Sequence, residues 1–127
     1  MNIIQSPDLP KPGGHYSQCI QHNGLLYISG QQLPCDPDTK EVPETIEAQT
    51  ELVLKYMDTI LKGSGADRDD VIQCRIYITD VAYWVIVNQI YATFFGSHKP
   101  VRATVPVPAL HYGCKIEIEA IAAIKKV

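Results

Sequence analysis

The C-terminal third of the chain contains Pro100-Val101-Arg102-Ala103-Thr104-Val105 and, after a loop, Lys115-Ile116-Glu117-Ile118-Glu119-Ala120-Ile121-Ala122. Both stretches alternate with period two, which is the pattern of a β-strand with two different faces. Arg102 and Thr104 share one face of the first strand, and Glu117 lies on the polar face of the second. An arginine beside a hydroxyl, together with a carboxylate, fits an anion clamp with an acid/base group. The alternative is two amphipathic strands whose outer faces are only solvated.

A β-hairpin is predicted in the first quarter of the chain. Asn23-Gly24 supplies the positive φ angles of a type I′ turn, so residues 15–20 and 25–29 should pair. The run Leu25-Leu26-Tyr27-Ile28 is apolar almost throughout, so we expect this strand to be covered on both faces. Residues 1–14, rich in proline and glycine, show no periodicity and predict an irregular lead-in.

The middle of the chain predicts two helices and a further strand. Apolar residues recur at spacings of three and four over residues 45–62, and a similar stripe runs over residues 81–95, from an Asp80 cap to a Gly96 stop. Between them, residues 71–78 alternate as a strand. One face of that strand is expected to carry Ile72, Cys74, Ile76 and Ile78, and the other Gln73, Arg75 and Tyr77.

The resulting element order is β-β-α-β-α-β-β within one domain, residues 1–127. Two helices interleaved with one sheet predict a two-layer α+β sandwich with both helices on one face. The other face would then lack a cover of its own although its central strands are apolar. Association of subunits would cover it, so the pattern predicts a homo-oligomer.

Composition narrows the possible partners. The net charge is −3, and lysine and arginine cluster only at Lys125-Lys126, which counts against a nucleic-acid partner. No apolar run is long enough to span a bilayer and no signal pattern begins the chain, so a cytoplasmic location without a membrane partner is expected. The cysteines lack zinc-site spacing and are expected to be buried thiols: Cys19, Cys35, Cys74 and Cys114.

Familiar catalytic motifs are missing from the sequence. There is no GxSxG, HExxH, GxxxxGK[ST] or GxGxxG, and the histidines are scattered. Arg102, a hydroxyl, Glu117, Tyr16 and the strand-ending Ser29-Gly30 remain. Gly30 either ends its strand or lets a ligand approach the backbone closely. These groups suit a small carboxylate-bearing substrate attacked by water, with no metal or covalent intermediate.

Several of these segments occur together in one known family. They are Gly14-His15-Tyr16-Ser17-Gln18, Asn23-Gly24 through Ile28-Ser29-Gly30-Gln31, Val87-Asn88-Gln89-Ile90-Tyr91 through Phe94-Phe95, Pro100 through Val107, and Lys115 through Ala122. In this order and spacing the chain resembles the RidA/YjgF family of reactive-intermediate imine deaminases. Some members of that family are labelled L-PSP endoribonucleases.

The resemblance implies a chorismate-mutase-like fold and a homotrimer with clefts between subunits. It implies hydrolysis of 2-imino acids, such as 2-iminobutanoate and 2-iminopropanoate, to 2-keto acids and ammonia, without a cofactor or a metal. Arg102 would hold the substrate carboxylate with the backbone at Thr104, and Glu117 would orient water and move its proton. The residues implied to line or support the site are Tyr16, Ser29, Gly30 and Asn88. Arg102 and Glu117 would meet across the subunit interface.

Three positions depart from the pattern common in this family: Tyr56 in the first helix, Cys19, and the bulkier loop of residues 108–113. They bear on substrate range more than on fold. Two other functions compete with imine hydrolysis. One is the ribonuclease or translation-inhibitor activity of the family's other label, and the other is a non-catalytic trimer that binds keto acids.

Overall fold

A computed structural model describes residues 1–30, 34–36, 38–39 and 41–124. Gln31 and Lys125-Lys126 lie outside these residues. The strands are β1 (Asn2–Ile4), β2 (Cys19–His22), β3 (Leu25–Ile28), β4 (Val71–Ile78), β5 (Val101–Pro106) and β6 (Ile116–Ala123). The helices are α1 (Ile46–Gly63) and α2 (Trp84–Phe95), and short 3-10 turns cover Arg68–Asp70, Val81–Tyr83 and His111–Gly113.

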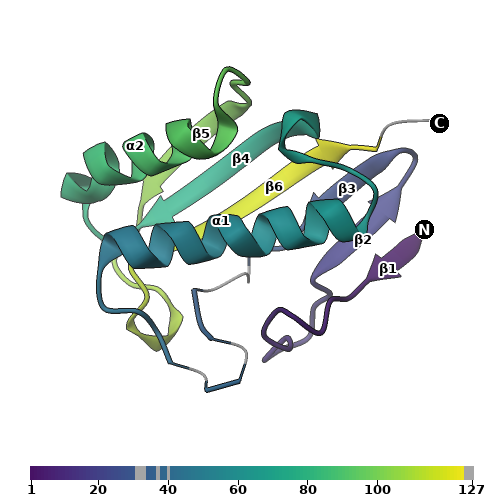
Figure 1. The fold of residues 1–127 in the computed structure, drawn as a ribbon. Coiled ribbons are helices and arrows are strands. Elements are labelled where there is room, and N and C mark those ends of the chain that lie inside the picture. Colours follow the sequence, from purple (N-terminus) through teal and green to yellow (C-terminus); the bar gives the residue numbers. More distant parts are fainter. Residues whose placement is uncertain (31–33, 37, 40, 125–127) are drawn as a thin grey trace.

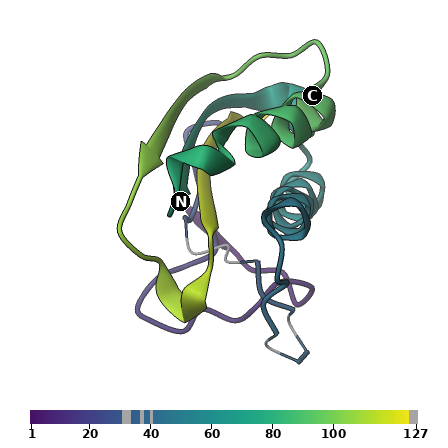
Figure 2. The same ribbon diagram turned by 90° about the vertical axis from the view of Figure 1, so that its left-hand side faces the viewer.

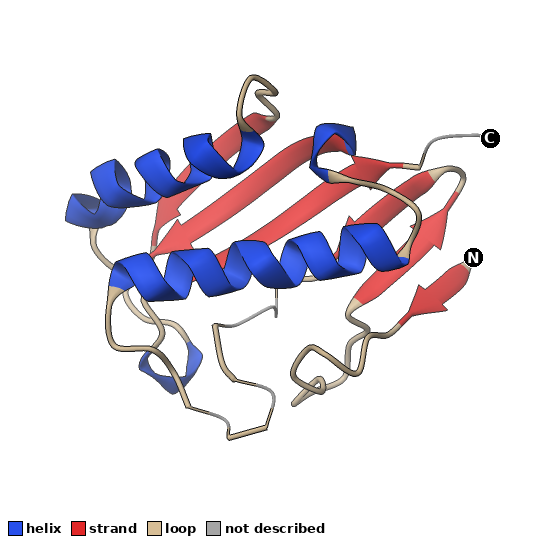
Figure 3. Cartoon of the chain, viewed as in Figure 1, coloured by secondary structure: helices blue, strands red, loops and turns tan. Residues whose placement is uncertain are grey.

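The strands form one mixed sheet in the order β1-β2-β3-β6-β4-β5. β4 and β5 run parallel, and the other neighbouring pairs are antiparallel. Both helices lie on the same side of this sheet (Figures 1 and 3), and the turned view in Figure 2 shows its other side uncovered by helices. The predicted α+β sandwich is therefore confirmed. β6 pairs with β3 and so lies beside the first hairpin.

Local sequence signals account for the ends of these elements. Asn23 and Gly24 have φ angles of 51° and 77°, which are those of the predicted type I′ turn. The Thr45 side chain caps α1 by accepting a hydrogen bond from the Ala48 amide. The Asp80 carboxylate accepts from the Ala82 amide, so the predicted cap is present. It begins a short 3-10 turn, however, and α2 starts only at Trp84.

The core lies between the sheet and the two helices. The inward-facing residues of β4 and β6 are almost completely buried, and α1 packs its apolar stripe against them. The central members of this core are Leu54, Ile60, Leu61, Ile76, Ile78, Ile116 and Ile118. All four cysteines are buried, as predicted. No helix in the described part of the chain is long and apolar enough to cross a membrane.

The N-terminal segment differs from its predicted irregular form. Residues Asn2–Ile4 pair with β2 as an edge strand, and the strand expected at 15–20 begins only at Cys19. Three residues are too few to show a period of two. Hydrogen bonding to a neighbouring strand makes β1, and the sequence pattern does not encode that contact.

Two predicted burial patterns are also wrong. Ile72 is 45% exposed, because a register shift between Val71 and Gln73 puts Val71 on the buried face instead. Tyr27 is also 45% exposed, so this chain covers only one face of β3. The alternation predicted for the remainder of β4 holds, with Cys74, Ile76 and Ile78 buried.

The register shift can be tested with two variants of one strand. Ile76→Ala removes a side chain that is 0% exposed and should cost about 2–5 kcal/mol of stability because it leaves a core cavity. Ile72→Ala should cost about 1 kcal/mol or less, since half-exposed apolar groups contribute little. Chemical denaturation of both variants measures the difference. Equal losses would contradict the observed register.

Candidate functional site

Arg102 lies on β5 with its side chain toward the helix layer. In the parallel β4–β5 pair it is opposite Cys74, whose side chain is buried. Its Nη1 donates a 2.9 Å hydrogen bond to Oδ1 of Asn88 on α2. The guanidinium carbon lies 4.9 Å from the centre of the Tyr91 ring and 5.7 Å from that of Trp84. A helix residue, two aromatic rings and the strand therefore hold this arginine in place.

The hydrogen bond from Arg102 also explains why the polar residue Asn88 occurs within the apolar stripe of α2. Asn88 is half-buried, and Arg102 satisfies its side-chain oxygen. A pocket beside this pair is lined by Asn88, Arg102 and residues from the end of α2 to Pro100. Thr104 is two residues along β5 on the same face and is half-buried.

Glu117 lies on the opposite face of the sheet, which none of the described helices covers. It is paired with Tyr77, an odd number of residues from Cys74 along β4, so its side chain points away from that of Arg102. A Cβ atom built on Gly30 would come within 3.1 Å of Glu117 Oε2, so a side chain here would require the carboxylate to shift by a few tenths of an ångström. The backbone at Gly30 therefore lies close to the Glu117 carboxylate, and the approach of a ligand there stays a prediction.

The proton affinity of Glu117 is unusual for a carboxylate. Burial and, to a smaller extent, the nearby Glu119 carboxylate together raise its pKa from 4.5 to about 7. A group with this pKa exists in both protonation states near neutral pH. It can therefore accept a proton and give it back in one reaction cycle.

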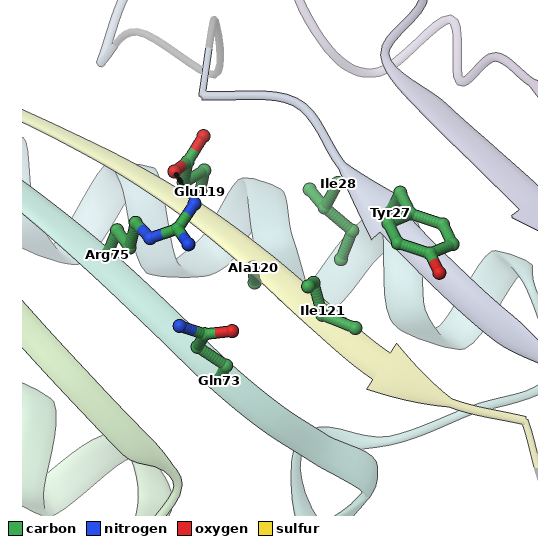
Figure 4. Close-up of a pocket in the computed structure, with 7 residues that line it drawn as sticks. All are labelled: Tyr27, Ile28, Gln73, Arg75, Glu119, Ala120 and Ile121. Carbon is green, nitrogen blue, oxygen red and sulfur yellow. Dashed lines mark hydrogen bonds and ion pairs between the residues drawn. The ribbon is translucent and has the colours of Figure 1, made fainter.

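Glu119 is two residues along β6 and shares the open face with Glu117. Its Oε1 accepts hydrogen bonds from Arg75 Nη1 and the Tyr77 hydroxyl, both at 3.0 Å. Figure 4 shows Arg75 of β4 and Glu119 of β6 pointing toward one another on this face, and Tyr27 and Ile121 line the same shallow pocket farther along the sheet. The carboxylates of Glu117 and Glu119 and the guanidinium of Arg75 thus lie together on this part of the open face.

Tyr16 and Ser29 are loop residues on either side of the hairpin strands. The Tyr16 hydroxyl accepts a 3.3 Å hydrogen bond from the Gly13 amide, and the Ser29 amide donates to the Gln18 carbonyl at 2.9 Å. Tyr16 lines a cavity with His111 and Tyr112 of the 108–113 loop. Ser29 directly precedes Gly30 and so lies close along the chain to the Glu117 carboxylate.

The predicted site residues therefore fall into separate groups within one chain. Arg102 lies with Asn88, and Glu117 lies with Gly30 on the other side of the sheet. Among the residues the structure describes, no cluster of three or more histidine, cysteine, aspartate or glutamate side chains could hold a metal ion.

Two of the departures from the family pattern lie in the core. Tyr56 is buried on α1, and its hydroxyl donates to the Cys35 carbonyl, so it fastens the helix to the preceding loop. Burial raises the pKa of Tyr56 to about 12, with help from Asp36 and Cys35. Cys19 is also buried, on β2, and burial raises the pKa of its thiol to about 11.

Sequence reasoning missed the contacts of Arg75, Tyr77 and Glu119. Alternation correctly put Arg75 and Tyr77 on one face of their strand and Glu119 on one face of another. The missing information was that β4 and β6 are neighbours in a register that pairs Arg75 with Glu119. The sequence likewise placed Trp84 and Tyr91 on the apolar stripe of α2 but did not predict their contacts with Arg102.

Comparison with known proteins identifies the family of the chain. The family model described as Endoribonuclease L-PSP matches residues 6–124. Reactive Intermediate Deaminase A, chloroplastic, of Arabidopsis thaliana is 44% identical over 123 residues, which are 96% of this chain and 65% of that protein. The chain belongs to this family, the RidA/YjgF family that its motifs resemble. The plant protein's name assigns it to the chloroplast, so a cytoplasmic location for this chain stays a prediction.

Solved structures agree with the fold throughout. RidA from an Antarctic Psychrobacter is 33% identical with a TM-score of 0.93, and the match covers 98% of this chain and 100% of that one. Escherichia coli TdcF with bound serine is 32% identical with a TM-score of 0.92, and the match again covers 98% and 100% of the two chains.

The raised pKa of Glu117 predicts a pH-dependent stability. Above about pH 7 the folded protein must keep this carboxylate ionised and partly desolvated, whereas well below pH 4.5 it is protonated whether folded or not. Glu117→Gln should therefore raise the melting temperature by a few degrees at pH 8 and by much less at pH 4.5. Glu51→Gln, an exposed change on α1, is the control. A Glu117→Gln effect that is independent of pH would contradict the prediction.

Proposed function

We propose that this protein hydrolyses 2-imino acids to 2-keto acids and ammonia in clefts between the subunits of a homotrimer. The main support for this proposal is Glu117, a half-buried carboxylate whose pKa of about 7 allows it to accept and donate a proton near neutral pH. Membership of a family that includes a protein named as a reactive intermediate deaminase supports the same activity. 2-Iminobutanoate and 2-iminopropanoate are the substrates of choice for testing it.

In this proposal Arg102 binds the substrate carboxylate. Asn88 occupies Nη1, and the guanidinium has further N–H donors in the planar arrangement that matches a carboxylate. Thr104 follows on the same face and contributes its backbone to the same end of the substrate. The TdcF relative is described with bound serine, which shows that a protein of this fold accepts a small amino acid.

Glu117 acts on water at the other end of the substrate. The ionised carboxylate takes a proton as water attacks C2 of the protonated imine, and it returns this proton to the nitrogen of the tetrahedral adduct. The C2–N bond then breaks, the adduct hydroxyl becomes the C2 carbonyl as it gives up its proton, and the nitrogen leaves as ammonia. The carboxylate is restored and the product is a 2-keto acid. Holding both reactants in place can contribute about 7–11 kcal/mol to lowering the barrier. In this proposal Tyr16, Ser29 and Gly30 line the same cleft as Glu117.

A second subunit is needed to complete this arrangement. Arg102 and Glu117 point to opposite sides of one sheet, so a single chain does not present both to one substrate. The open face of the sheet also exposes Tyr27, Val101 and Val105, which are apolar groups that association would cover. A trimer with clefts at its interfaces would join Arg102 of one chain to Glu117 of the next.

Endoribonuclease activity is the second candidate, favoured by the description of the family model. The net charge of −3 counts against it, because RNA binding draws on clustered lysine and arginine. RNA cleavage by the purified protein, lost on Glu117→Gln, would establish this activity instead. Binding of 2-ketobutanoate without turnover would indicate a sensor.

Loss of the arginine tests the carboxylate clamp. Arg102→Ala should lower kcat/KM for 2-iminobutanoate by about 100-fold or more, because the substrate loses its charge-assisted anchor. The imine is generated by an amino-acid oxidase, and its loss is followed by semicarbazone trapping. Lys55→Ala, an exposed charge deletion on α1, should retain full activity. Wild-type activity in Arg102→Ala would refute the mechanism.

Mixing two inactive variants tests the shared cleft. Arg102→Ala and Glu117→Gln chains that assemble together should form some clefts with both wild-type residues. Random mixing in equal amounts should restore about one quarter of wild-type activity, because each mixed trimer holds one intact cleft. Each variant alone is the control. Mixed trimers, verified by native mass spectrometry, that stay inactive would exclude clefts shared between subunits.

A further inference from the structure

Two carboxylates converge on one point of the open face. A Cβ atom on Gly30 would lie 3.1 Å from Glu117 Oε2 and 3.5 Å from Glu119 Oε2. The other Glu119 oxygen, Oε1, is held at 3.0 Å by both Arg75 and Tyr77. Arg75 and Tyr77 on β4 therefore fix Oε1 of Glu119. The other oxygen, Oε2, points toward Gly30 and Glu117.

We propose that Glu119, anchored by Arg75 and Tyr77, is a positioning residue that controls the proton on Glu117. The catalytic role of this control rests on the proposed function. The electrostatic coupling between Glu119 and Glu117 does not depend on that function. Arg75 offsets part of the Glu119 charge, and Tyr77 keeps the carboxylate in place. The three residues together set how strongly a negative charge is felt at Glu117.

The charged and titratable groups facing Glu117 come from its own strand and from its neighbours. Glu119 lies on β6, Arg75 and Tyr77 lie on β4, and Cys114 and Lys115 immediately precede β6. The backbone at Ser29-Gly30 approaches from the end of β3 and carries no ionisable side chain. Of the side chains, Glu119 is the one that raises the pKa of Glu117 in addition to burial.

This coupling has a consequence for catalysis. A like charge nearby disfavours ionisation of Glu117, so the group takes up the proton from water more readily than an isolated carboxylate would. Full charge on Glu119 would shift the working range toward alkaline pH, because the base would then stay protonated. The Arg75 ion pair moderates this effect, and so the pair tunes the pH range of the enzyme.

Two variants should move the proton affinity of Glu117 in opposite directions. Glu119→Gln removes the like charge at nearly constant shape, and should lower the pKa of Glu117 by on the order of one pH unit. Arg75→Gln removes the cation while Tyr77 still holds Glu119, so the pKa of Glu117 should rise. Glu51→Gln on α1 is the matched charge control and should change nothing.

The measurement is a carboxyl-carbon NMR titration of the full-length protein labelled at glutamate, with Glu117→Gln used to assign the signal. The acid limb of the pH profile of kcat/KM for 2-iminobutanoate should move with the titration in each variant. Shifts in the same direction in both variants, or in neither, would overturn the proposal, as would the same shift in Glu51→Gln. If Glu119 and Arg75 had only a structural role, both variants would change stability, but the pKa of Glu117 would not move in opposite directions in the two.

The titration distinguishes this inference from the proposed function. If wild-type protein does not hydrolyse imines but the two pKa values move as expected, the proposed function fails while the coupling stands. If imines are hydrolysed but the titration of Glu117 is insensitive to Glu119 and Arg75, the coupling fails while the function stands.

Discussion

The pleat of β6 is the constraint on which the rest of the structure depends. This strand lies in the interior of the sheet, between β3 and β4, and buries Ile116 and Ile118 beneath α1. Because successive side chains point to opposite faces, burial of these isoleucines forces Glu117 and Glu119 onto the other face. A one-residue slip would bury both carboxylates in the core, so core packing and the orientation of the candidate site are set together.

The same sheet separates the two groups that the proposed reaction needs. Arg102 faces the helix layer from an edge strand, where Asn88, Tyr91 and Trp84 hold it. Glu117 faces the side without helices. A sheet one chain thick cannot bring its two faces to one small substrate, and this is the physical reason for proposing a cleft shared between chains. The apolar groups exposed on the open face provide a driving force for the same association.

Glu117 illustrates how a site can act against folding. Partial burial and a neighbouring carboxylate both disfavour its ionised form, so holding it in place costs stability at neutral pH. The same resistance to ionisation suits Glu117 to acid/base chemistry, because a carboxylate with a pKa near 7 can both accept and donate a proton. Gly30 permits this close approach, since any side chain there would contact the carboxylate.

The sequence by itself determined the class of fold and, for most of each strand, which side chains share a face. Period-two alternation in the last two strands, the Asn23-Gly24 turn and the stripe of α1 are local signals, and the structure has the elements they predict. Local patterns failed at β1 and at Ile72, where pairing with a neighbouring strand decides the outcome.

Only the tertiary structure decided which strands are neighbours, and the candidate site depends on that order. Arg75 and Glu119 are 44 residues apart in the chain, and only the β4–β6 register brings them into contact. Parallel pairing with β4 put Arg102 on the helix side, which alternation within β5 alone could not specify. Periodicity follows from the geometry of one strand, whereas pairing depends on how all the strands share one buried face.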